Sequence, residues 1–83
     1  MQCVKTWNGG CTDRLSFLLT EYGDREYSVE ECYHKCLGTQ FCVAFSIKIT
    51  DGVCDLYKTG CLKSGNKNKN YYSMDTCSRG KII

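Results

Sequence analysis

The sequence predicts a small, disulfide-rich α+β domain in which one short helix packs against an antiparallel sheet. The first observation is that 83 residues contain 8 cysteines, an even number at a density typical of disulfide-stabilised secreted domains. The second is a capped helical segment at about 29–37, and the third is an alternating apolar segment at 41–49. A chain of this length forms one domain, which we take as residues 1–83.

The helix is expected at about Val29–Leu37. Ser28 is a favourable N-cap, and Glu31, three residues later, completes a capping box. Cys32 and Cys36 are four residues apart, so both sulfur atoms point to the same side of the helix. The expected buried face consists of Val29, Cys32, Tyr33, Cys36 and Leu37.

An alternating strand, Phe41–Ile49, follows the helix, and Val53–Tyr57 is its expected return strand after the turn signal Thr50-Asp51-Gly52. The alternation predicts that Cys42 and Cys54 lie on the face opposite to the apolar residues. These apolar residues are Phe41, Val43, Phe45, Ile47 and Ile49. Phe45 and its neighbours either belong to the core or leave an apolar contact surface.

Weaker strands are expected at Leu15–Tyr22 and Tyr71–Met74. The stretch Lys58–Asn70 is rich in Lys, Asn and Gly and predicts an exposed loop. Asn8-Gly9-Gly10 predicts a turn. Trp7, just before it, either covers the core or is an exposed anchor.

The cysteine spacing favours disulfides over metal or redox chemistry. Structural zinc sites usually show repeated close pairs such as Cys-x₂-Cys, whereas the closest pair here is Cys32-x₃-Cys36, which has no second copy. A thioredoxin-like site needs Cys-x-x-Cys, which does not occur. We therefore expect no metal and no cofactor, and an oxidising, extracellular environment reached through the secretory pathway.

Local geometry narrows the many possible pairings. Cys36 and Cys42 flank the corner between helix and strand, and Cys32, one helical turn back, is within reach of the return strand at Cys54. Chain termini are often close in space, which favours Cys3–Cys77. Cys11 and Cys61 are left, and they pair by elimination.

The ordered motifs resemble those of PAN/apple domains, whose core has Cys-x₃-Cys on a helix, Cys-x-x-Phe on a strand and Cys-x-Leu on the next strand. The matching segments here are Cys32-x₃-Cys36, Cys42–Phe45 ("CVAF") and Cys54–Leu56 ("CDL"), with Cys3 and Cys77 completing the six-cysteine pattern. The resemblance covers nearly the whole chain. It implies the bridges Cys3–Cys77, Cys32–Cys54 and Cys36–Cys42, and a curved antiparallel sheet that cradles one α-helix. Cys11 and Cys61 depart from the family pattern.

PAN/apple domains are non-catalytic binding modules for proteins or carbohydrates, so the resemblance implies an extracellular adhesion module. The chain looks most similar to the repeated modules of apicomplexan microneme adhesive proteins. This implies secretion, storage in micronemes, and host-cell attachment through host-cell surface glycans or glycoproteins, or through another secreted adhesive protein. The alternatives are an apple module of a secreted plasma-type protease zymogen or growth factor that serves protein docking, and a spacer that binds nothing. We expect one module of a larger multi-module protein, monomeric when isolated.

A candidate ligand-binding set lies in and around the lysine-rich stretch. An aromatic ring can stack on a sugar while ammonium and amide groups hydrogen-bond to it, and a basic patch suits sulfated or sialylated glycans. The set is Lys58, Lys63, Lys67, Lys69, Tyr71 and Tyr72. The alternative is a solvated loop that leads into a strand, with one tyrosine in the core and the other exposed.

Other function classes are not favoured by the sequence. The net charge of +2 is too small to indicate a nucleic-acid partner, and no apolar run is long enough for membrane insertion across a bilayer. His34 is the only histidine, and its place in the capped helix fits a solvated residue better than a catalytic base. We therefore expect no catalytic residues and no enzyme activity.

Overall fold

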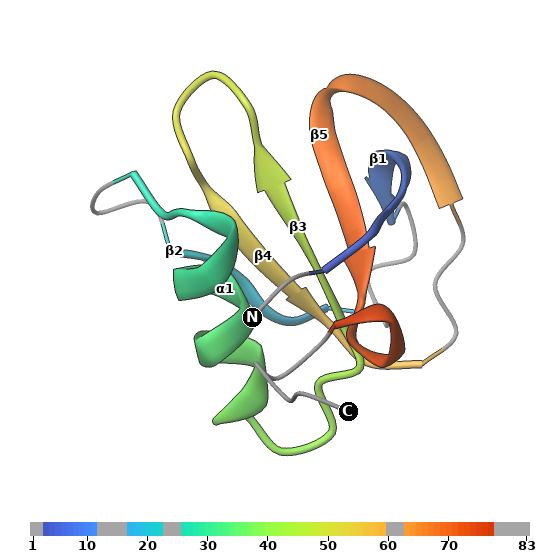
Figure 1. Ribbon diagram of the computed structural model, residues 1–83. Coiled ribbons are helices and arrows are strands. Elements are labelled where there is room, and N and C mark those ends of the chain that lie inside the picture. The colour runs from blue at the N-terminus through green and yellow to red at the C-terminus, as the bar shows by residue number, and fades with distance from the viewer. Residues whose placement is uncertain (1–2, 12–16, 23–25, 60–62, 78–83) are drawn as a thin grey trace.

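The computed structural model describes residues 3–11, 17–22, 26–59 and 63–77. Helix α1 (Val29–Leu37) lies on one face of a curved five-stranded antiparallel sheet with strand order β1-β5-β3-β4-β2 (Figure 1). The strands are β1 (Lys5–Cys11), β2 (Phe17–Tyr22), β3 (Ala44–Lys48), β4 (Cys54–Tyr57) and β5 (Lys63–Ser73), followed by the short 3-10 helix η2 (Met74–Thr76). The predicted small α+β class is confirmed. β2 falls within the predicted Leu15–Tyr22, whose first two residues lie outside the described residues.

Helix α1 occupies the predicted range because its first turn is capped as the sequence indicates. The Ser28 hydroxyl accepts a hydrogen bond from the Glu31 N–H at 3.1 Å, and the Glu31 carboxylate accepts one from the Ser28 N–H at 2.9 Å. The buried residues of the helix are Cys32, Tyr33 and Cys36. Leu37 was predicted to share this face but is 45% exposed, because α1 ends there and the chain turns away.

Strands β3 and β4 form the predicted hairpin, but β3 is shorter than the predicted Phe41–Ile49. Phe41 lies in a turn with φ of +72°, a left-handed conformation that a strand residue does not adopt. The turn signal at 50–52 is confirmed: Gly52 has φ of +69°, and its N–H donates to the Lys48 carbonyl at 2.8 Å. The return strand begins at Cys54, one residue later than predicted.

Strands β5 and β1 occupy a predicted loop and a predicted turn. Much of the stretch predicted as a loop, from Lys63 onward, belongs to β5, which is far longer than the predicted Tyr71–Met74. The predicted turn at 8–10 lies inside β1. Between Asn8 and Gly9 the partner of β1 shifts from Asn70 to Gly65, and Gly9 has φ of +151°. Glycine permits this conformation, so β1 follows the arched β5 across a β-bulge.

The predicted placement of Cys54 opposite to the apolar face was wrong. Cys54 lies directly across from Ile47, and Leu56 lies directly across from Phe45. Residues that face each other in an antiparallel pair share one face of the sheet, and which residues pair depends on the length of the turn. The shared face is the one beneath α1, where Phe45 and Ile47 are buried in the core. They are therefore core residues and leave no contact surface of their own.

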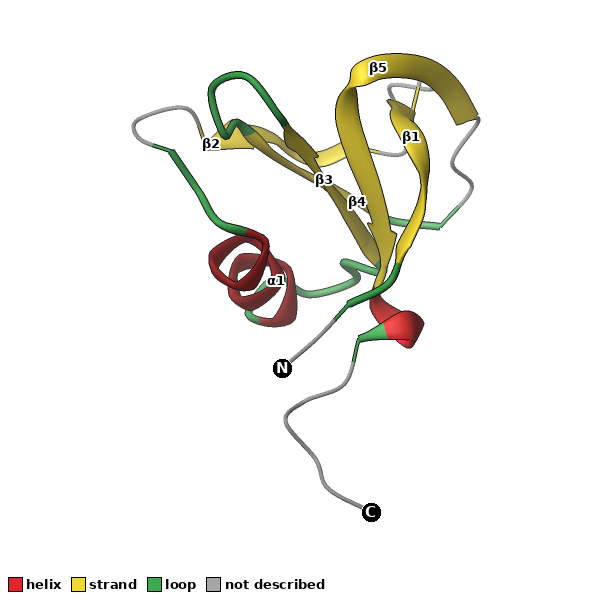
Figure 2. Ribbon diagram, turned by 45° about the horizontal axis from the view of Figure 1, so that its top comes forward, coloured by secondary structure: helices red, strands yellow, loops and turns green. Residues whose placement is uncertain are grey.

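The opposite face of the sheet, called here the far face, carries a second buried cluster. Its members are Cys11, Ala44, Tyr57 and Tyr71. Trp7 is partly buried against this cluster and meets the Tyr71 ring edge-on at 6.2 Å, so it covers a core. Figure 2 shows α1 on one side of the sheet and the arch of β5 beside β1. The small domain thus buries apolar side chains on both faces of its sheet.

Three disulfides join these elements. They are Cys3–Cys77, Cys32–Cys54 and Cys36–Cys42, the three predicted from local geometry and implied by the PAN/apple resemblance. Cys11 is disulfide-bonded as well, while its expected partner Cys61 lies outside the described residues. Disulfides in this number are typical of proteins of the secretory pathway and the extracellular space.

Candidate functional site

The lysines predicted to form one basic patch lie at different levels of the sheet. Lys58 directly follows β4, level with the beginning of β3, because Tyr57 pairs with Ala44. Lys69 pairs with Lys48, the last residue of β3. Four residues of strand, at about 3.3 Å each, separate these levels by roughly 13 Å. The structure therefore does not bring Lys58 and Lys69 together.

The two remaining lysines of the predicted set also belong to β5. Lys63 pairs with Cys11 at the beginning of the strand. Lys67 is exposed on the arch, two residues before Lys69. Of the predicted lysines whose side chains are described, Lys58 and Lys67 are exposed and lie at different places.

The two tyrosines of the predicted set point to opposite faces of β5. Tyr72 stacks on Phe45 beneath α1, with ring centroids 5.2 Å apart. Tyr71 stacks on Tyr57 on the far face, with ring centroids 5.8 Å apart. Their exposures are only 8% for Tyr71 and 9% for Tyr72. Neither a shared sugar-stacking site nor one exposed ring is observed, and both rings are part of buried cores.

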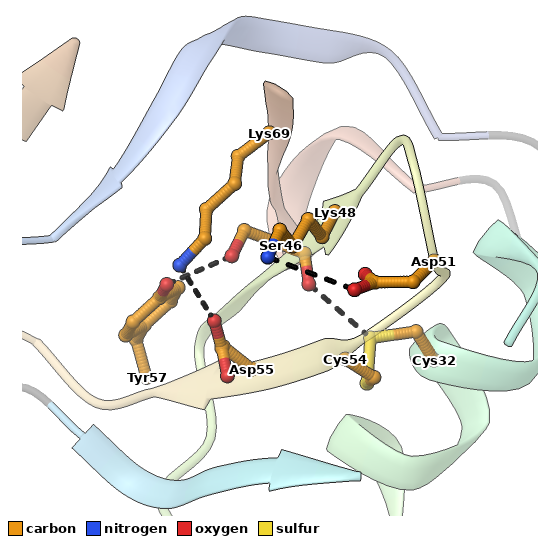
Figure 3. A network of polar contacts seen from close by, with 8 residues as sticks. All are labelled: Cys32, Ser46, Lys48, Asp51, Cys54, Asp55, Tyr57 and Lys69. Atoms are coloured by element: carbon orange, nitrogen blue, oxygen red, sulfur yellow. Dashed lines mark hydrogen bonds and ion pairs between the residues drawn. A yellow bond between two sulfur atoms is a disulfide. The ribbon is translucent and has the colours of Figure 1, made fainter. Parts of the chain in front are cut away.

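Lys69 takes part in a polar network on the far face (Figure 3). Its Nζ lies 2.9 Å from Oδ2 of Asp55, a carboxylate whose side chain is only 6% exposed. The neighbouring Lys48 lies 3.6 Å from the Asp51 carboxylate. Each of these two facing lysines is paired with a carboxylate, and the charge of Lys69 stabilises the buried Asp55.

Tyr57 and Ser46 are the other buried polar residues of this network. Its hydroxyl is 2.8 Å from the Ser46 hydroxyl, and both residues are fully buried. A Cβ on Gly10 would come within 3.0 Å of the Tyr57 hydroxyl, so β1 closes tightly over it. Burial and the nearby Asp55 charge raise the pKa of Tyr57 to about 12, although the Ser46 hydrogen bond opposes this shift. The hydroxyl is therefore a neutral hydrogen-bonding group at physiological pH.

This raised pKa predicts a loss of stability in alkaline solution. An unfolded tyrosine ionises near pH 10 and folded Tyr57 near pH 12. Keeping the neutral hydroxyl buried therefore stabilises the fold fully below pH 10, and this stabilisation is lost as the pH rises from 10 to 12. The loss amounts to about 1 kcal/mol by pH 11. Tyr57→Phe should be less stable than the wild type at pH 8, because Ser46 loses its hydrogen-bond partner. In urea unfolding between pH 8 and 11, the free energy of unfolding of the wild type should fall towards that of the variant. If the free energies of unfolding of the two proteins changed in parallel with pH, Tyr57 would not have the raised pKa.

A pocket of about 280 Å³ lies where the beginning of α1 meets the β3–β4 turn, and we call it the N-terminal pocket. Its lining residues are Glu26, Tyr27, Ser28, Glu31, Ile47, Lys48, Ile49 and Gly52. The Tyr27 N–H donates to the Gly52 carbonyl at 3.0 Å, and a Cβ on Gly52 would come within 2.8 Å of the Glu26 Cα. Two segments far apart in sequence are therefore held together, which gives the pocket fixed walls.

An exposed apolar group lies at the opposite end of α1. We call Leu37, Phe41 and Val43 the apolar tip. Phe41 is 72% exposed, and Val43 and Leu37 are also exposed. The Cys36–Cys42 disulfide closes the turn that presents Phe41. The sequence prediction missed this tip because it placed Phe41 in a strand. The expected Cys36–Cys42 bridge could have revealed the tip, because a disulfide between residues six positions apart excludes an extended chain directly before Cys42.

The described residues contain few groups suited to catalysis or metal binding. No three His, Cys, Asp or Glu side chains gather around a possible metal position within them. His34 is exposed on α1, 3.8 Å from the Glu30 carboxylate, which fits the solvated position expected from the sequence. In the same part of the chain, no helix has the length and apolar character needed to cross a bilayer.

Comparisons of the chain with models of protein families, with curated proteins and with solved structures found no match.

Proposed function

We propose that the protein is a non-catalytic extracellular adhesion module of the PAN/apple type, which contributes to host-cell attachment by recognising a partner at its surface. Its support is the disulfide framework: all three pairs implied by the sequence resemblance occur among the described residues, where a helix lies on a curved antiparallel sheet. Secretion and storage in micronemes, and a place among several modules of one protein, belong to the same proposal.

The observation that carries the binding role is the apolar tip. Aromatic residues, Phe among them, are enriched at protein–protein interfaces relative to the rest of the surface, and Phe41 is the most exposed large apolar residue among those described. The rings proposed for sugar stacking, Tyr71 and Tyr72, are buried. A protein partner therefore fits this surface better than a carbohydrate.

A cell-binding experiment tests this function. The fluorescently labelled, oxidised domain is added to cultured fibroblasts, with parallel samples treated with trypsin, sialidase or heparinase. We expect saturable binding that trypsin abolishes, that both glycosidases leave intact, and that Phe41→Ser weakens at least tenfold. The matched control is Val4→Ser, which alters another exposed apolar residue and should leave binding unchanged.

Two results would overturn the proposal. Absence of saturable binding to the cells would favour a spacer. Binding that is lost after heparinase or sialidase, and that is insensitive to Phe41→Ser but weakened by Lys67→Ala, would replace the protein partner with an acidic glycan.

A further inference from the structure

We propose that this domain self-associates head to tail, with the apolar tip of one copy inserted into the N-terminal pocket of a second copy. The inference goes beyond the proposed function but uses the same apolar tip, so a copy whose tip occupies a pocket does not present that tip to another partner. It is tested on the purified chain alone, so its outcome does not depend on the cell-binding result. The sequence predicts a monomer, and the association proposed here is weak enough for the monomer to dominate in dilute solution.

The tip has the properties of an inserted anchor. Phe41 keeps φ of +72°, a conformation that glycine adopts freely and a bulky residue adopts only under strain. The aromatic ring is nevertheless placed in solvent, where it makes little contribution to the core. Leu37 and Val43, exposed residues at the same end of α1, add apolar surface there, and the Cys36–Cys42 disulfide limits how far the turn can move. Little entropy is therefore lost when the tip is buried by a partner.

The pocket is large enough for such an anchor, and its lining combines apolar and polar residues. A benzene ring enters an apolar protein cavity of about 150 Å³, and the N-terminal pocket measures about 280 Å³. Ile49, 55% exposed at the rim, supplies most of the accessible apolar surface, while the largely buried Tyr27 and Ile47 contribute small areas beside it. The contact of Gly52 with Glu26 and Tyr27 keeps these walls in place without a ligand.

The two surfaces cannot meet within one molecule. The pocket includes Ser28, the N-cap of α1, whereas Leu37 ends the helix and Phe41 follows it. The nine residues of α1, at about 1.5 Å each, separate the two ends by roughly 13 Å. The contact therefore joins two copies through different surfaces. Such heterologous contacts extend into chains of molecules unless the rotation closes a ring.

Charges at the two surfaces are complementary. Lys58 is exposed beside the tip, because the carbonyl of the preceding Tyr57 accepts the Val43 N–H at 2.9 Å. Glu26 is exposed at the pocket, and Glu31 contributes a second carboxylate to its lining. Lys48 also lines the pocket, but its ammonium group lies 3.6 Å from the Asp51 carboxylate, which offsets its charge. A lysine facing the Glu26 and Glu31 carboxylates favours the head-to-tail orientation over tip-to-tip contact, which would oppose two lysines.

Sedimentation velocity over a range from micromolar to millimolar protein tests the contact. We expect the wild-type sedimentation coefficient to rise with concentration, and Phe41→Ser and Ile49→Ser each to remain monomeric. A mixture of these two variants should form a dimer, because one retains the pocket and the other retains the tip. Association that Phe41→Ser leaves intact, or a mixture that stays monomeric, would overturn the proposal, as would a monomeric wild type at every concentration.

Two further variants separate recognition from folding. Phe41→Gly removes the ring and suits the backbone conformation, so it should unfold at or above the wild-type temperature and yet fail to associate. Lys58→Glu and Glu26→Lys should each weaken association about threefold or more, and a molecule carrying both should recover it, as expected for a charge pair across the contact. Loss of association in Phe41→Gly together with a lowered unfolding temperature would assign Phe41 a structural role instead.

Discussion

Replacing both Cys32 and Cys54 with alanine is expected to lower the free energy of unfolding by about 4–5 kcal/mol. The bridge spans 22 residues, for which the restricted unfolded chain accounts for about 3 kcal/mol. Both sulfur atoms are fully buried between α1 and the hairpin, so their loss also leaves a small cavity. Domains of this size are stable by roughly 4–12 kcal/mol, and the variant should be partly unfolded at 37 °C. Urea titration followed by circular dichroism measures the change.

The matched control is the double alanine variant of Cys36 and Cys42. This bridge spans only six residues, so the same chain-entropy relation predicts a loss of about 2 kcal/mol. Cys36 is buried but Cys42 is only partly buried, so the cavity left is smaller than that left by Cys32 and Cys54. If removing this short bridge cost as much as removing Cys32–Cys54, the stabilisation would have to come from something other than loop closure and core packing.

The parts of the fold that were predictable are those with strong local signals. The capping box of Ser28 and Glu31 located α1, and the apolar run with a glycine turn located the central hairpin. Strand β1 and most of β5, apart from its end at Tyr71–Ser73, were not predicted because their sequences are polar and rich in Gly, Asn and Lys. The two strands pair with each other, and β5 also pairs with β3; such long-range pairing leaves no local pattern.

The candidate site was less predictable than the fold for a related reason. Tyr71 and Tyr72 are adjacent in sequence, and adjacent residues in a strand must point to opposite faces. The role of Lys69 depends on Asp55, a partner 14 positions away in the chain on a strand that is not adjacent to β5 in the sheet. The exposure of Phe41 depends on where β3 begins. Each of these properties is set by tertiary structure.

The Lys69–Asp55 pair provides the second large expected effect, a loss of about 3 kcal/mol in Lys69→Met. Methionine is of similar length to lysine and fills the same space, but it leaves the Asp55 carboxylate, with a side-chain exposure of only 6%, without the ammonium group that neutralises it. A buried charge without its partner is far more costly than an exposed one. Urea unfolding at pH 7, followed by the fluorescence of Trp7, the only tryptophan, measures the loss.

Removing the other partner should cost less, and this asymmetry tests the explanation. In Asp55→Asn the amide oxygen still accepts from Lys69, whose side chain is 23% exposed and keeps contact with water. Replacing both residues, as Lys69→Met with Asp55→Leu, should recover most of the stability, because a buried ion pair contributes little more than a well-packed apolar pair. Equal losses in the two single variants, or no recovery in the double variant, would mean that Lys69 stabilises the arch of β5 through packing of its aliphatic chain, which lies beside Gly10, and that its charge is incidental.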